Sequence, residues 1–79
     1  TYPQIKNNIY IKKNISIQKD KKINALYLRY KKENKDLRFL IRKSGTEPLL
    51  RVLIEGKNKK LVNEISSKII KNLNEILNV

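Results

Sequence analysis

The sequence predicts an α+β fold, a two-layer sandwich in which two helices pack on one face of a small sheet. Three patterns lead to this prediction. Two short segments have the alternating apolar spacing of half-buried strands, a third short segment is rich in branched apolar residues, and two longer ones have the three-to-four-residue spacing of amphipathic helices. Their order is strand, helix, strand, strand, helix. Placing both helices on one face of the sheet is the economical way to bury both apolar stripes.

The first half of the chain predicts a strand and then a helix. From Gln4 to about Lys12, Ile5, Ile9 and Ile11 share one parity, which is typical of a strand with one buried face, although Asn7 interrupts the pattern. Asp20 is a candidate N-cap for the helix, which we expect to end near Asn34. The expected buried face of this helix consists of Ile23, Leu26, Tyr27 and Tyr30.

The second half predicts two strands and a long helix. Apolar and charged residues alternate around Phe39, and branched apolar residues fill Leu49 to Glu55, ending at Gly56. The connection between these strands is short, so we expect an antiparallel hairpin. Asn58 is a candidate cap for the last helix, whose apolar stripe is about five turns long.

Length and composition restrict the possible functions. Residues 1–79 are enough for one domain with a thin core. The absence of Cys and His excludes a disulfide framework, a zinc knuckle, a thiol nucleophile and catalysis by imidazole. No apolar stretch approaches the ~20 residues that span a bilayer, and no signal-peptide pattern opens the chain. We therefore expect a cytoplasmic domain without membrane contact and, since it begins with Thr1, a piece of a longer protein.

The charge balance allows a second interpretation. The chain has 19 Lys and Arg against 7 Asp and Glu, a common footprint of nucleic-acid binding, and four tyrosines could stack on bases. A stand-alone basic nucleic-acid-binding module is therefore the alternative function. However, 15 Lys, 10 Asn and 12 Ile are also what an A+T-rich genome encodes, and the lysines are dispersed. Nucleic acid is accordingly the less favoured partner. The four tyrosines that could stack on bases are Tyr2, Tyr10, Tyr27 and Tyr30.

The connection between the last two strands has the composition of a phosphate-binding loop. Ser44 and Thr46 supply hydroxyl groups, and Gly45 can adopt a positive φ that turns consecutive backbone N–H groups toward an anion. Arg42 and Arg51 flank the loop, one near the end of each strand, so both guanidinium groups can reach the same anion. The expected affinity is millimolar or modestly better.

Two further residues are expected to support this loop. Lys43 adds a point charge next to the hydroxyl donors. A carboxylate beside a phosphate is unfavourable unless a cation neutralises it, so we expect Glu47 to pair with Arg42, Arg51 or Lys43 and to orient the loop.

The same residues allow two other interpretations. Ser44 and Glu47 have the spacing of a helix capping box, but Pro48 would then occupy a helical position whose N–H is needed. The branched residues that follow also favour a strand. A plain polar hairpin turn with two solvated arginines remains possible.

The fifteen residues from Arg42 to Gly56 resemble, nearly residue for residue, the phosphate-binding segment of the bacterial phosphoglucosamine mutase family. This segment lies in the fourth, C-terminal domain of those enzymes, which belong to the α-D-phosphohexomutase superfamily. Tyr2-Pro3-Gln4, leading into an Ile-rich strand, is similar to the start of the same domain. The resemblance implies the predicted fold. It also implies that five residues hold the substrate phosphate that is not reacting, namely Arg42, Ser44, Gly45, Thr46 and Arg51.

The resemblance further implies an isomerase, an intramolecular phosphotransferase that interconverts glucosamine 6-phosphate and glucosamine 1-phosphate on the route to UDP-N-acetylglucosamine and peptidoglycan. Enzymes of this family use a phosphoserine and Mg²⁺. This chain lacks their Thr-Ala-Ser-His, Asp-x-Asp-x-Asp and Gly-Glu-x-Ser-Gly-His segments. We therefore expect no catalytic residue, metal ligand or cofactor in these 79 residues, and no catalysis by them alone. The expected partners are a hexosamine phosphate and the remaining mutase domains; a degenerate fragment that keeps only the fold is a third possibility.

Overall fold

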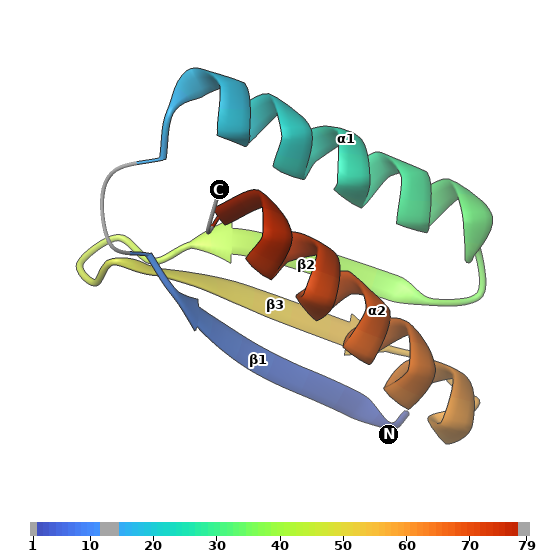
Figure 1. Ribbon diagram of the computed structural model, residues 1–79. Coiled ribbons are helices and arrows are strands. Elements are labelled where there is room, and N and C mark those ends of the chain that lie inside the picture. The colour runs from blue at the N-terminus through green and yellow to red at the C-terminus, as the bar shows by residue number, and fades with distance from the viewer. Residues whose placement is uncertain (1, 12–14, 78–79) are drawn as a thin grey trace.

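The structure, a computed structural model, describes residues 2–11 and 15–77 and has the predicted order of elements. Figure 1 shows two layers, with the two helices on the same side of the sheet. The predicted α+β sandwich is therefore confirmed. The elements of the described residues are β1 (Gln4–Tyr10), α1 (Ile17–Glu33), β2 (Arg38–Lys43), β3 (Leu49–Glu55) and α2 (Lys59–Leu77).

The sheet has β3 at its centre. Its strand order in the described residues is β1-β3-β2, and both outer strands run antiparallel to β3. The predicted hairpin of the last two strands is thus confirmed. The register places Arg51 of β3 opposite both Asn8 of β1 and Arg42 of β2. Residues that are directly opposite in neighbouring strands project from the same face of a sheet, so these three side chains share one face.

The hydrophobic core lies between the sheet and the two helices. The residues with the least exposure come from the central strand and from the inner stripe of α2, as the apolar periodicity of both segments predicts. Tyr30 of α1 is also buried, and its hydroxyl oxygen accepts a hydrogen bond from the side-chain amide of Asn72 at 2.6 Å, which joins the two helices. The four most completely buried side chains are Ile54, Val62, Ile69 and Leu73.

The helix N-termini agree only in part with the sequence. The predicted cap Asn58 is confirmed, because its Oδ1 accepts the N–H of Leu61 at 3.2 Å. The predicted cap Asp20 is wrong: α1 begins one turn earlier, where the Ser16 side chain accepts the N–H of Lys19 at 3.2 Å. Asp20 instead lies in the first turn, where its negative charge complements the helix dipole. No helix within the described ranges is both long and apolar enough to cross a membrane.

The C-terminal end of α1 agrees with the prediction, and that of β1 does not. The end of α1 agrees with the sequence, since Asn34 is its C-cap. β1 ends at Tyr10, earlier than predicted, and the predicted strand end near Lys12 lies outside the described residues.

Gly56 allows the end of β3 to approach the helix layer closely. A Cβ atom at this position would overlap Cδ2 of Leu37 and lie 3.2 Å from Cγ2 of Val62, and both side chains are buried. We expect Gly56→Ala to lower the free energy of unfolding by about 1–3 kcal/mol, because the core must shift to accept a methyl group. Urea unfolding measures this. Gly45→Ala is the matched control, because a Cβ atom at this position meets nothing within 4 Å. We expect Gly56→Ala to lose more unfolding free energy than Gly45→Ala.

Candidate anion-binding site

The β2–β3 loop is a hairpin turn held by its own backbone and by Ser44. The N–H of Ser44 donates to the carbonyl of Leu49 at 2.9 Å, and the N–H of Leu49 donates to the carbonyl of Glu47 at 2.8 Å. The Ser44 hydroxyl accepts the N–H of Glu47 at 3.4 Å. This last contact is half of a capping box, but a strand follows it, so the helix-cap interpretation is wrong. Ser44 is thereby fixed at the end of β2.

Gly45 and Thr46 form the exposed tip of this loop. The expectation of a positive φ at Gly45 is wrong, since no glycine in the described ranges has one. The turn is instead closed by the Ser44 and Leu49 hydrogen bonds, with Pro48 fixing the backbone before β3. No acceptor within the described residues takes the N–H groups of Gly45 and Thr46. Among the described residues, both donors therefore have no protein acceptor.

The two predicted arginines are direct neighbours across the hairpin. Arg42 of β2 and Arg51 of β3 are opposite in the register, and both are exposed on the sheet face that the helices leave uncovered, here called the open face. Opposite residues have Cβ atoms about 4.5–5.5 Å apart, and like charges on directly opposite residues are destabilising. An anion between them removes this repulsion. The pair thus favours anion binding.

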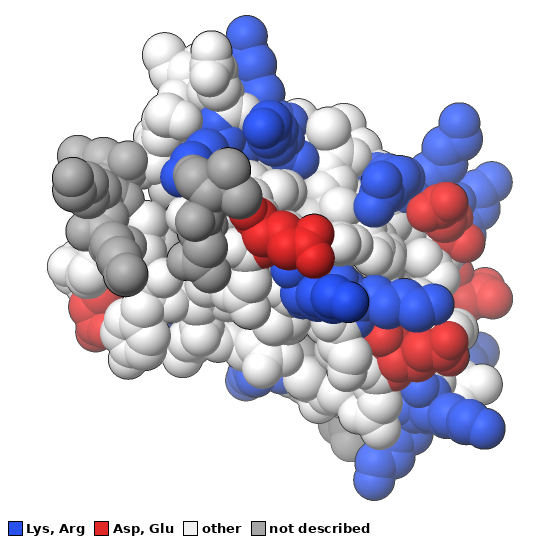
Figure 2. Space-filling view, viewed as in Figure 1, with Lys and Arg blue, Asp and Glu red and all other residues white. Residues whose placement is uncertain are grey.

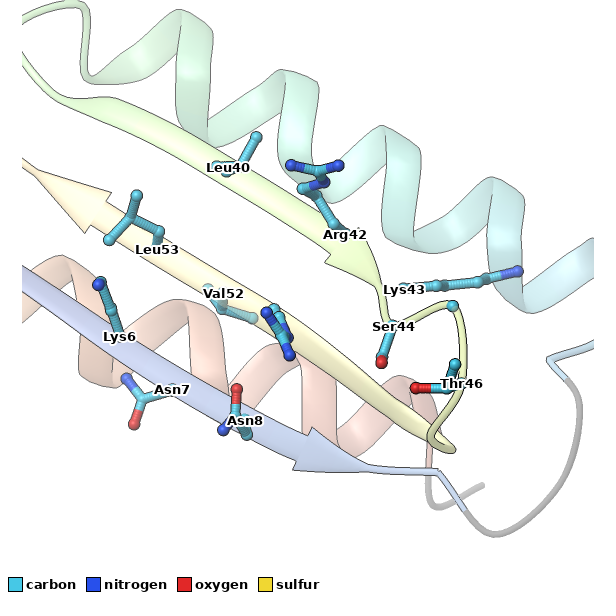
Figure 3. Close-up of a pocket in the computed structure, with 12 residues that line it drawn as sticks. Lys6, Asn7, Asn8, Leu40, Arg42, Lys43, Ser44, Thr46, Val52 and Leu53 are labelled. Atoms are coloured by element: carbon cyan, nitrogen blue, oxygen red, sulfur yellow. The ribbon is translucent and has the colours of Figure 1, made fainter.

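The loop and the open face border a hollow of about 740 Å³ that is open to solvent (Figure 3). This volume lies within the usual range of small-molecule sites, about 300–1,000 Å³. All five predicted phosphate-binding residues line it, and so does Lys43. Sequence reasoning missed its β1 side, because only the pairing of β1 with β3 brings these residues to the loop. The remaining lining residues are Lys6, Asn7, Asn8, Leu40, Val52 and Leu53.

The two predicted supporting residues are placed differently from the expectation. The Lys43 ammonium forms an ion pair with the Asp20 carboxylate at 3.0 Å, and Figure 3 shows its side chain directed toward α1 rather than toward Ser44. Glu47 forms none of the expected ion pairs with Arg42, Arg51 or Lys43. It orders the loop through its backbone, which contacts Ser44 and Leu49. Glu47 itself is exposed.

The donor set of the hollow is suited to binding an anion and not to chemistry on it. It combines guanidinium and ammonium groups, hydroxyl groups and backbone N–H groups. Within the described residues, no three acidic side chains gather into a possible metal site, and the chain has no Cys or His. The described residues therefore offer no cluster of three metal-ligating side chains.

The nucleic-acid alternative gains no support. Tyr27 is half-buried and its hydroxyl donates to the carbonyl of Phe39 at 3.4 Å, while Tyr30 is buried in the core, so neither ring is a free stacking surface. Figure 2 shows Lys and Arg side chains in several separate groups, with acidic side chains among them. A single continuous basic surface is absent from the face in this view. Tyr2 and Tyr10 are exposed, at opposite ends of β1.

Fold and hollow together define a small α+β domain with a hollow, lined by hydrogen-bond donors, at the loop between its last two strands. Residues 8–72 match the family model described as phosphoglucomutase/phosphomannomutase, C-terminal domain. The chain belongs to this family.

Three relatives carry the name phosphoglucosamine mutase. The protein of Bacillus subtilis is 37% identical over 70 residues, 87% of this chain and 16% of the relative. That of Buchnera aphidicola is 36% identical over 73 residues, 91% of this chain and 16% of the relative. That of Campylobacter hominis is 43% identical over 63 residues, 80% of this chain and 14% of the relative. The family resemblance seen in the sequence is thus confirmed, and the chain spans about one-sixth of these relatives.

Proposed function

We propose that residues 1–79 form a single domain that binds the phosphate of a hexosamine phosphate as part of a phosphoglucosamine mutase. The observation that carries the proposal is that five residues from β2, the loop and β3 line one hollow, with two guanidinium groups opposite each other. The relatives' name supplies the substrate class. The proposed phosphate ligands are Arg42, Ser44, Gly45, Thr46 and Arg51.

The proposed site binds weakly. Each charge-assisted hydrogen bond contributes about 1.5–3 kcal/mol, and two or three net contacts correspond to millimolar or modestly better affinity. The hollow is open to solvent, which screens the charges further. Weak binding suits the proposed role: the domain holds the phosphate that is not reacting, and the sugar must be released and turned so that either end can occupy the hollow.

Catalysis in this proposal belongs to the remaining mutase domains. Those domains supply a phosphoserine, and Mg²⁺ bound there supplies the electrophilic assistance that phosphoryl transfer requires. The residues of this chain bind and orient the substrate: the arginines neutralise the phosphate charge, and Ser44 and Thr46 fix its rotation through directional hydrogen bonds. The cytoplasm, where sugar phosphates are made and used, is the proposed location.

An amide NMR titration of the chain with glucosamine 6-phosphate at about 0.15 M salt tests this proposal. We expect shifts confined to the loop and the neighbourhood of Arg51, saturating in the millimolar range, and no shifts with glucosamine, which lacks the phosphate. A short DNA duplex is the second comparison. Shifts spread over the lysines of the helices with DNA, together with none from the sugar phosphate, would contradict the proposal and favour a basic binding module or a fragment that keeps only the fold.

A further inference from the structure

Asn8 of β1 occupies the side of the hollow that the loop and the arginines leave open. It is the register partner of Arg51, is exposed and lines the hollow. Figure 3 shows its side chain directed from β1 toward β3. Its neighbour Asn7 has the opposite parity along the strand and is half-buried. The carboxamide of Asn8 is therefore the one that the strand presents on the open face beside Arg51.

The sheet arranges Asn8, Arg51 and Arg42 in a row across three adjacent strands. Neighbouring strands lie about 4.8 Å apart, so an anion held over Arg51 is within reach of a side chain on either side. Arg42 approaches it from β2 and Asn8 from β1. A carboxamide offers two N–H donors and one acceptor, so Asn8 can donate to an anion while its oxygen accepts from the Arg51 guanidinium.

We propose that Asn8 is an additional ligand of the bound phosphate, donating from its side-chain NH₂ group to a phosphate oxygen on the side away from Arg42. This inference rests on the proposed function and extends it to a residue outside the loop. A neutral donor adds direction to the site without adding a positive charge. It therefore orients the phosphate while leaving the ion pairing to the two arginines.

Titration of the chain with inorganic phosphate, at constant ionic strength, tests this inference. Loss of one neutral hydrogen bond predicts that Asn8→Ala weakens phosphate binding about three- to tenfold. Asn8→Asp has nearly the same shape but repels the phosphate and competes for Arg51, so we expect a loss of more than about tenfold. Asn74→Asp is the matched control, because it makes the same charge change at an exposed position on α2. Its affinity is expected to stay within about twofold of the unchanged chain, as surface charges far from a site are screened.

The side-chain amide resonances of Asn8 give a second readout that needs no variant. We expect them to shift with the same phosphate dependence as the amides of Gly45 and Thr46. Unchanged Asn8 resonances, or wild-type affinity in Asn8→Ala while Arg51→Ala loses binding, would overturn the role of Asn8 and leave the proposed function standing. Absence of any phosphate binding by the unchanged chain would instead overturn the proposed function itself.

Discussion

Arg51→Ala is expected to abolish measurable binding of glucosamine 6-phosphate by this chain. Arg51 lies at the centre of the open face, with Asn8 and Arg42 opposite it on the two flanking strands. Its guanidinium can form two parallel hydrogen bonds to a phosphate, each worth about 1.5–3 kcal/mol. Losing one to two such bonds weakens a millimolar site by at least about tenfold, beyond the range of a practical titration. Amide NMR at fixed salt measures this.

Arg38→Ala is the control for this variant. Arg38 lies on the same strand and face as Arg42 but four residues away, about 13 Å along the strand, and its register partner is Glu55. The Arg38→Ala variant removes the same charge as Arg51→Ala, but Arg38 does not line the hollow. We expect its affinity for the sugar phosphate to remain close to that of the unchanged chain. Equal losses in the two variants would mean that overall charge, and not the site, determines binding.

Leu73→Ala is expected to have the largest effect on stability. Leu73 lies on the inner stripe of α2 and its exposed fraction is 0%. Truncating a fully buried leucine removes apolar contacts and leaves a cavity, which lowers the free energy of unfolding by about 2–5 kcal/mol. A domain of this length has a total of about 4–12 kcal/mol. The variant is therefore expected to be largely or partly unfolded, which urea unfolding followed by circular dichroism measures.

Leu28→Ala makes the same truncation on α1 at a side chain that is 54% exposed. Its unfolding free energy is expected to change by less than about 0.5 kcal/mol, as is usual for surface substitutions. A loss in Leu28→Ala as large as in Leu73→Ala would contradict the placement of the two helices on the sheet.

The order of the elements could be predicted because each carries its own periodicity. The stripe of α2 and the alternation around Phe39 depend only on neighbouring residues, and both are reproduced in the structure. The start of α1 could not be predicted in the same way. Ser16 and Asp20 are both good capping residues, and Ile17 has the same parity as Ile5 and Ile9 of the first strand. In the structure Ile17 is an exposed residue of the first helical turn.

The candidate site could be predicted where it is contiguous in the chain. Ser44 and Thr46 share one loop, and a hairpin necessarily brings Arg42 near Arg51. Asn8 could not be found, since its position depends on the register between β1 and β3, which lie far apart in the sequence and are held by sheet pairing. The ion pair between Lys43 and Asp20 likewise depends on how α1 packs over β2.

A crystal structure of the chain grown with glucosamine 6-phosphate is the decisive experiment for the proposed function, because it locates the phosphate. We expect phosphate oxygens within about 2.7–3.2 Å of the Ser44 and Thr46 donors and of both guanidinium groups of the open face. Asn8 should complete the shell from β1. A phosphate bound only among lysines of the helices, with the hollow lined by Arg42 and Arg51 left without ligand at saturating concentration, would contradict it.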